Sequence, residues 1–107
     1  LSPETVDQIG EEQNNRRDLV LVMPMRWRLG YHHILRSAHL APDGYGHFGF
    51  GGSGAWVDPS RELAVAMVCN RGSGTPVGDA RLMALSRAAL EAADRIADED
   101  GRLTEAS

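Results

Sequence analysis

The sequence contains no lysine. All 11 of its basic side chains are arginine, against 15 acidic side chains, and the formal net charge is −4. Without an ε-amine the chain cannot build a P-loop phosphate site, a Schiff-base lysine or a Ser-x-x-Lys nucleophile from its own residues. The excess of negative charge argues against nucleic acid as a partner, because a nucleic-acid surface needs basic residues that release counterions.

Cysteine and long apolar stretches are also scarce. Cys69 is the single cysteine, so no internal disulfide can form and the redox compartment stays open. The longest apolar runs, Leu19 to Met23 and Leu63 to Cys69, are far shorter than the roughly 20 residues of a membrane span. Residues 1–12 are polar and acidic and show no signal peptide. We therefore expect no membrane span, and we favour the cytoplasm over secretion unless a signal lies upstream.

The two ends of the chain predict helices. Ser2 followed by Pro3 is typical of a helix start, so we expect a short helix ending near Gln13. Thr75 and Pro76 repeat this pattern before the C-terminal helix. That helix should pack on a sheet through apolar residues at helical spacing, and residues 98–107 are expected to be a frayed tail. The stripe consists of Leu82, Leu85, Ala89, Ala93 and Ile96.

The middle of the chain predicts strands. Leu19 to Leu35 should be extended, with a first strand over Leu19 to Val22 and alternating side chains from Trp27 onwards. Tyr45 to Val57 is interpreted as a glycine-rich strand, and Leu63 to Asn70 as a strand buried on both faces. The Asp-Pro turn between these two makes an antiparallel hairpin. The expected fold class is α+β: an antiparallel sheet with flanking N-terminal and C-terminal helices, over one segment of 107 residues.

Two glycine motifs in the middle strand resemble functional motifs but lack the structural context that those motifs require. The dinucleotide pattern G-x-G-x-x-G starts at both Gly44 and Gly49, but it requires a helix afterwards, and here a strand and a turn follow. Gly51 to Ala55 misses the G-x-S-x-G nucleophile elbow at its last position and also lacks the following helix. We therefore expect no nucleotide cofactor, and a sheet serine rather than a nucleophile at Ser53.

The four histidines do not have the spacing of metal ligands on one helix or strand face, so no metal is expected. His32 and His39 are most simply solvated or capping residues. His47 differs because glycines surround it, and such a backbone suggests that something approaches it closely. The alternative is a barrel corner or a β-bulge.

A family resemblance rests on Gly46 to Arg71. This stretch resembles the third-motif strand and the following strand of the serine β-lactamase-like superfamily, most closely its β-lactamase-related esterases, with class C β-lactamases and penicillin-binding proteins as cousins. His47-Phe48-Gly49 stands where β-lactamases have Lys-Thr-Gly. Gly51-Gly52-Ser53, the Asp-Pro turn and a strand ending in Asn70-Arg71 follow as in the family. Trp27 to Tyr31 also resembles the family's W-x-L-G-[YF] strand.

The resemblance implies that the chain is the C-terminal part of a larger β-lactamase-like domain. The family's Ser-x-x-Lys and Tyr-x-Asn motifs have no counterpart here, and the chain begins with Leu1 rather than methionine. We therefore expect a C-terminal fragment whose partner is the remaining N-terminal part of the same hydrolase, in the same or a separate chain. The fragment alone should be inactive.

The resemblance also implies roles in acyl transfer on a small ester or amide. The Phe50 backbone N–H would be the second oxyanion-hole donor, and His47 would take the place of the lysine. Phe48, Gly49, Gly51 and Gly52 would line the substrate. A neutral imidazole and a missing hydroxyl at residues 47 and 48 favour an esterase over a β-lactamase. The alternatives are a penicillin-recognising peptidase or β-lactamase, and a non-catalytic interaction domain.

Overall fold

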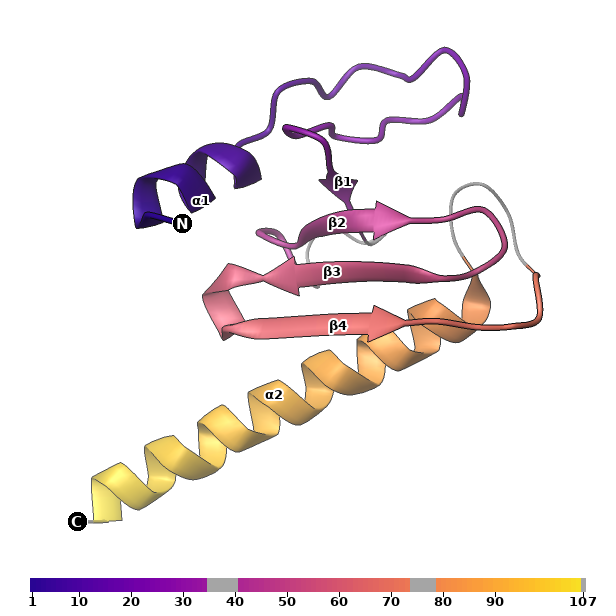
Figure 1. The fold of residues 1–107 in the computed structure, drawn as a ribbon. Coiled ribbons are helices and arrows are strands. Elements are labelled where there is room, and N and C mark those ends of the chain that lie inside the picture. Colours follow the sequence, from indigo (N-terminus) through magenta and orange to yellow (C-terminus); the bar gives the residue numbers. More distant parts are fainter. Residues whose placement is uncertain (35–40, 74–78, 107) are drawn as a thin grey trace.

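The computed structural model describes residues 1–34, 41–73 and 79–106. Four antiparallel strands form one sheet in the order β1-β2-β3-β4, with a helix at each end of the chain (Figure 1). This confirms the α+β class. The elements are α1 (Pro3–Gly10), β1 (His32–His33), β2 (Tyr45–Phe48), β3 (Gly54–Asp58), the 3₁₀ helix η1 (Pro59–Arg61), β4 (Leu63–Met67) and α2 (Ala80–Ala106).

Helix α1 begins as its sequence predicts. The Ser2 hydroxyl accepts a hydrogen bond from the Thr5 N–H at 3.2 Å, and Pro3 occupies the first turn. The helix ends at Gly10, three residues earlier than expected, because Glu11 takes an extended backbone conformation.

The predicted strand over Leu19 to Val22 is wrong. These residues form a turn, and the side chains of Leu19 and Val20 are 95% and 86% exposed. The cause is Asp18, whose Oδ1 accepts hydrogen bonds from the N–H groups of both Val20 and Leu21 at 2.8 Å. This local side-chain bond offers the backbone an alternative to a strand ladder.

The part of the predicted extended segment from Trp27 onwards forms fewer strand residues than the alternation of its side chains predicts. Within the part of this segment that the structure describes, up to Ile34, only His32 and His33 lie in a strand. Isolated bridges also join Asn14 with Trp27 and Arg17 with Pro24. Gly30 has φ +81°, and this left-handed residue breaks the alternation.

The single glycine-rich strand predicted over Tyr45 to Val57 is wrong as well. The chain reverses between Phe48 and Gly54, which are paired across β2 and β3. Gly51 and Gly52 have φ of +100° and +111°, so the glycines make a hairpin turn rather than a continuous strand. The predicted site residues therefore lie at and beyond the end of β2.

The hairpin of β3 and β4 is confirmed. Asp58 is fully buried and caps η1, because its Oδ1 accepts hydrogen bonds from the N–H and the hydroxyl of Ser60. Its Oδ2 pairs with Arg61 at 2.7 Å, and Arg61 also pairs with Asp94 of α2. However, β4 ends at Met67, and its alternation buries one face only, which corrects the expectation of burial on both faces.

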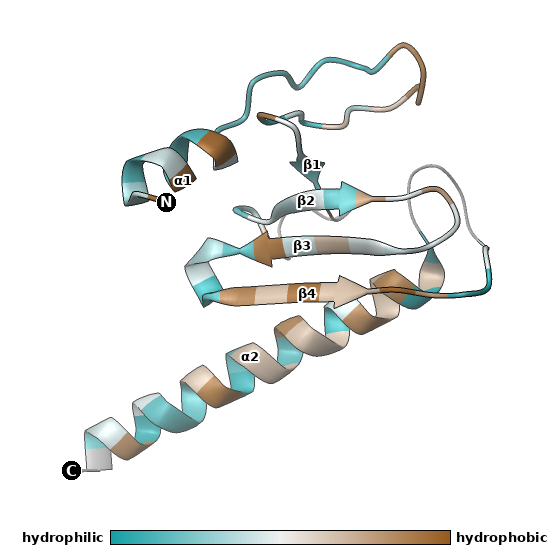
Figure 2. Cartoon of the chain, viewed as in Figure 1, coloured by the Kyte–Doolittle hydropathy of each residue, from teal (hydrophilic) through white to brown (hydrophobic). Residues whose placement is uncertain are grey.

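The hydrophobic core lies between the sheet and α2. Phe48 and Trp56 point from the sheet toward Leu82 and Leu90 of the helix. Hydrophobic residues recur on β3, on β4 and along the part of α2 beside them (Figure 2). At the centre, the Trp56 indole N–H donates a hydrogen bond to the Ser86 hydroxyl at 2.8 Å, and both side chains are buried.

Helix α2 differs from its prediction in two respects. Leu85 and Ile96 are exposed, and the inward line runs instead through Leu82, Ser86 and Leu90, because the polar Ser86 is needed beneath Trp56. The helix continues through residues 98–106, so the expected frayed tail is helical up to Ala106.

The last part of α2 mixes good helix formers such as Leu103 and Ala106 with the poor helix former Gly101. Two of its side chains donate to carbonyls one turn back: Arg102 to Asp98, and Thr104 to Asp100. The predicted cap residues Thr75 and Pro76 lie outside the described residues. No helix within the described ranges has the length and hydropathy needed to cross a membrane.

The Trp56 to Ser86 hydrogen bond predicts a stability effect. Ser86→Ala leaves a buried N–H without its acceptor, so the free energy of unfolding should fall by about 1–3 kcal/mol. Urea denaturation measures this, with Arg87→Ala on the exposed face of α2 as the matched control. In a Trp56→Phe background the Ser86→Ala change should cost much less; equal costs in both backgrounds would contradict the assignment.

Candidate active-site edge

The predicted site residues gather at the end of β2 and in the turn that follows it. Phe48 points into the core between the sheet and α2, so its neighbour His47 points to the opposite face. Ala55 is the cross-strand partner of His47, and both are exposed. His47 therefore stands on the sheet face that α2 leaves open.

The turn over residues 49–53 presents Phe50 at its tip. The Gly49 N–H donates to the Ser53 carbonyl at 2.8 Å, and the Gly52 N–H donates to the Gly49 carbonyl at 3.3 Å. The Phe50 side chain is 81% exposed, and none of the described residues accepts a hydrogen bond from its backbone N–H. That N–H can therefore donate to an oxygen of another molecule, which is the chemical property that an oxyanion hole requires.

The four residues expected to line a substrate have different surroundings. The Phe48 side chain is only 5% exposed and belongs to the core, so it offers no surface to a substrate. The Gly51 carbonyl accepts a hydrogen bond from the Ser73 N–H at 3.0 Å, and a Cβ at Gly49 would lie 3.2 Å from the Ser53 carbonyl oxygen. Gly51 and Gly52 have positive φ, and Gly52 is also buried, so these two glycines serve the shape of the turn itself.

The sequence did not predict the surroundings of His32, which lies beside the end of β2. It is buried rather than solvated, and its Nε2 lies 3.3 Å from the Phe48 N–H while its Nδ1 lies 2.9 Å from the His33 carbonyl oxygen. These two bonds require the tautomer that carries its proton on Nδ1. Its ring meets the His47 ring edge-on at 5.4 Å. A signal was available in the strand alternation, which places His32 and His33 on opposite faces; His39 lies outside the described residues.

Desolvation keeps His32 and His33 neutral at pH 7. Desolvation lowers the pKa of His32, opposed by the bond to the His33 carbonyl and assisted by unfavourable electrostatic interactions with His47 and Arg28. Desolvation and the charges of Arg26 and Arg28 lower the pKa of His33 to about 4. Within the described ranges, no three His, Cys, Asp or Glu side chains come together as metal ligands.

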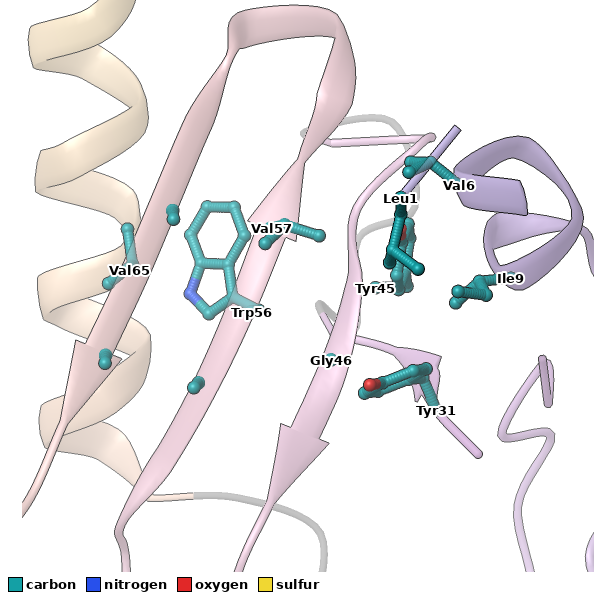
Figure 3. A pocket seen from close by; sticks show the side chains of 12 residues that line it. Leu1, Val6, Ile9, Tyr31, Tyr45, Gly46, Trp56, Val57 and Val65 are labelled. Atoms are coloured by element: carbon teal, nitrogen blue, oxygen red, sulfur yellow. The ribbon is translucent and has the colours of Figure 1, made fainter. Parts of the chain in front are cut away.

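An apolar groove of about 390 Å³ lies on the open face of the sheet. Helix α1 forms one of its sides, where Val6 and Ile9 stand beside Tyr45 (Figure 3). Its floor includes Val57 of β3 and the small side chains of β3 and β4, which belong to the face opposite α2. The face that bears His47 is thus apolar and uncovered over much of its area.

Comparison with known proteins first gives the class of molecule to which this edge belongs. It is the serine hydrolases with a β-lactamase-like fold. The family model described as Beta-lactamase matches residues 1–90. The chain therefore belongs to the beta-lactamase family.

One curated relative carries both activities in its name. Esterase/beta-lactamase LipL of Mycobacterium tuberculosis (strain ATCC 25618 / H37Rv) is 41% identical over 61 residues, which cover 53% of this chain and 14% of the relative. The chain thus spans a small part of the length of the relative that it matches. No solved structure matches it significantly.

The lowered pKa values of the buried His32 and the half-buried His33 predict a pH dependence of stability. Free histidine has a pKa of about 6.5, so at pH 5 to 6.5 the unfolded chain binds protons that the folded chain excludes. The free energy of unfolding should therefore fall as the pH drops through this window, by at most about 1.4 kcal/mol per pH unit for each histidine. Urea denaturation between pH 5 and 7.5 measures the slope, above the range in which carboxylates titrate.

His32→Gln and His33→Gln provide the controls for this slope, since glutamine keeps a polar side chain that does not titrate. Each variant should flatten the dependence on pH. A free energy of unfolding that is constant from pH 7.5 to 5 in the parent protein would contradict the assignment.

Proposed function

We propose that this chain is the oxyanion-hole segment of a serine esterase that acts by acyl transfer. The observation that carries the proposal is the turn after β2, which presents the Phe50 N–H without a partner among the described residues. The strand ends in His47-Phe48, and Gly49 begins the turn. The Phe50 N–H is the second oxyanion donor; the first donor, the N–H of the attacking serine, and that serine itself come from the remaining N-terminal part of the hydrolase. That part carries the Ser-x-x-Lys and Tyr-x-Asn motifs.

The open face of the sheet supports the proposal that the serine comes from the N-terminal part and the Phe50 N–H from this chain. His47 projects from the face that α2 leaves uncovered, and the apolar groove occupies the same face. Apolar area of this kind gains free energy when it is covered, at about 25 cal/mol per Å². The remaining part of the hydrolase would cover it and bring its serine opposite the turn.

Ester substrates fit this edge better than β-lactams do. The residue in place of the family's threonine, Phe48, has its side chain in the core and offers no hydroxyl. His47 offers an imidazole where a lysine would offer a permanent cation for the carboxylate of a β-lactam. The relative's name supports both chemistries, so β-lactam hydrolysis is the second candidate.

If Phe50 acts through its backbone N–H, a substitution that removes this N–H should lower the rate and one that removes only the side chain should not. In the complete hydrolase, Phe50→Pro deletes the N–H and should lower kcat on p-nitrophenyl esters by about 10²–10³, the effect of losing one oxyanion donor. Phe50→Ala keeps the N–H and should retain kcat to within a few-fold. Steady-state kinetics with both variants tests the role, and equal effects of the two would contradict it.

The 107-residue chain alone serves as the control for that assay, since we expect it to give no turnover. Turnover by the chain alone that disappears in Ser53→Ala would overturn the proposal. A complete protein with no Ser-x-x-Lys motif, and no reaction with any ester, would favour a non-catalytic interaction domain instead.

The preference for esters is expected to depend on His47. His47→Lys restores the permanent cation of the family's third motif, so reaction with a chromogenic cephalosporin should rise relative to p-nitrophenyl ester hydrolysis. The ratio of the two kcat/KM values measures the shift, and His47→Gln is the uncharged control. A ratio that stays the same in the lysine variant would argue against a role for this residue in substrate choice.

A further inference from the structure

The turn that carries Phe50 is attached to two other parts of the chain by side chains. Glycines at positive φ give this turn little stiffness of its own. Ser53, at its end, is bonded to the stretch just beyond β4, and Gly52, at its centre, lies against the start of α2. Four side chains make these attachments, and we call them the turn clamp: Ser53, Cys69, Asp79 and Arg81.

Ser53 makes the first attachment. Its hydroxyl oxygen accepts a hydrogen bond from the Cys69 N–H at 3.1 Å and lies 3.5 Å from the Cys69 sulfur. The Cys69 thiol in turn lies 3.6 Å from the Gly51 carbonyl oxygen. The serine in the near match to a nucleophile motif therefore faces the backbone that follows β4, so its hydroxyl is engaged in structure.

Asp79 and Arg81 make the second attachment. Arg81 donates through Nε to Asp79 Oδ1 at 3.0 Å and through Nη2 to Asp79 Oδ2 at 2.9 Å, a two-point contact of a guanidinium with a carboxylate. The same Nη2 donates to the Arg71 carbonyl at 3.1 Å. Asp79 is buried, and the pair with Arg81 lowers its pKa to about 2.

This ion pair lies directly against the turn. A Cβ placed on Gly52 would lie 2.8 Å from Asp79 Oδ2 and 2.9 Å from Arg81 Nη2. The backbone of Gly52, two residues from Phe50, therefore lies against the ion pair at the start of α2. A side chain at residue 52 would have to displace the ion pair and would be strained at the φ of +111°.

We infer that Ser53 and the Asp79–Arg81 pair are positioning residues that hold the Phe50 N–H in line with the developing oxyanion. The inference rests on the proposed function. An oxyanion donor works only when it is about 2.7–3.1 Å from the position of the oxyanion, and a misplacement of about 1 Å can cost roughly 100-fold in rate. The clamp residues act through the turn and make no contact with the substrate.

The experiment uses the complete hydrolase and two matched pairs of variants. Arg81→Met removes the guanidinium, and Arg81→Lys keeps a positive charge but cannot make the two-point contact. Ser53→Val removes the hydroxyl, and Ser53→Thr keeps the hydroxyl on a side chain of the same shape as valine. We expect kcat on p-nitrophenyl esters to fall roughly 10- to 100-fold in the methionine and valine variants with KM little changed. The threonine variant should recover most of the rate, and the lysine variant only part, since a point charge cannot make the two-point contact.

The rate of amide hydrogen exchange in residues 49–53 measures how firmly the turn is held, independently of enzyme activity. Exchange in this turn should accelerate in Arg81→Met and Ser53→Val, while the core strands exchange as in the parent. Arg87→Met, an exposed arginine on the same helix, is the control and should change neither reading.

The outcomes separate this inference from the function on which it rests. If Phe50→Pro abolishes activity but Arg81→Met and Ser53→Val keep the parent kcat, the clamp is overturned and the oxyanion assignment stands. If Phe50→Pro leaves kcat unchanged, the proposed function itself fails. A loss of rate that threonine at residue 53 does not recover, or turn exchange that stays at the parent rate, would also overturn the positioning role.

Discussion

Covering one face of the sheet with α2 is the interaction on which the rest of the structure depends. Trp56 is the largest fully buried side chain, and it meets Leu82, Leu90 and Ser86 on the helix. Because strand residues alternate, placing Trp56 and Phe48 against α2 forces His47 and Ala55 onto the other face. The side on which the site faces is thus decided by the core and not by the site residues themselves.

The end of β2 is supported from both sides by polar groups of different kinds. On the β1 side, the neutral imidazole of His32 accepts the Phe48 N–H and touches the His47 ring. On the β4 side, a carboxylate–guanidinium pair and a serine hydroxyl hold the glycine turn. These supports fix the backbone on either side of Phe50 and leave its own N–H unpartnered among the described residues.

Predictions from the sequence held where a few adjacent residues decide the structure. Ser2 with Pro3 starts α1, and Asp58 with Pro59 turns β3 into β4, because each signal acts within four residues. The strand expected at Leu19 failed for the same kind of reason, since Asp18 bonds the next turn of backbone. Local chemistry therefore decided both the successes and this failure.

Residues whose partners lie far along the chain could not be predicted in this way. Ser86 faces inward because Trp56, 30 residues away, needs an acceptor, and His32 is buried because β2 packs beside it. For the proposed site, the residues now found in the turn were predicted through family resemblance, and that prediction is still to be tested. The sequence did not connect them with Asp79 and Arg81. Their contact with Gly52 exists only once α2 has packed on the sheet.

The ion pairs of Arg61 have a consequence for the order in which the chain folds. Strands β2, β3 and β4 are joined by short turns, so their contacts close small loops, whereas Arg61 and Asp94 are 33 residues apart in the chain. Short loops close at a lower entropic cost than long ones. We therefore expect the three-stranded meander to form early and α2 to dock late, so that the glycine turn gains its final shape only in the last step of folding.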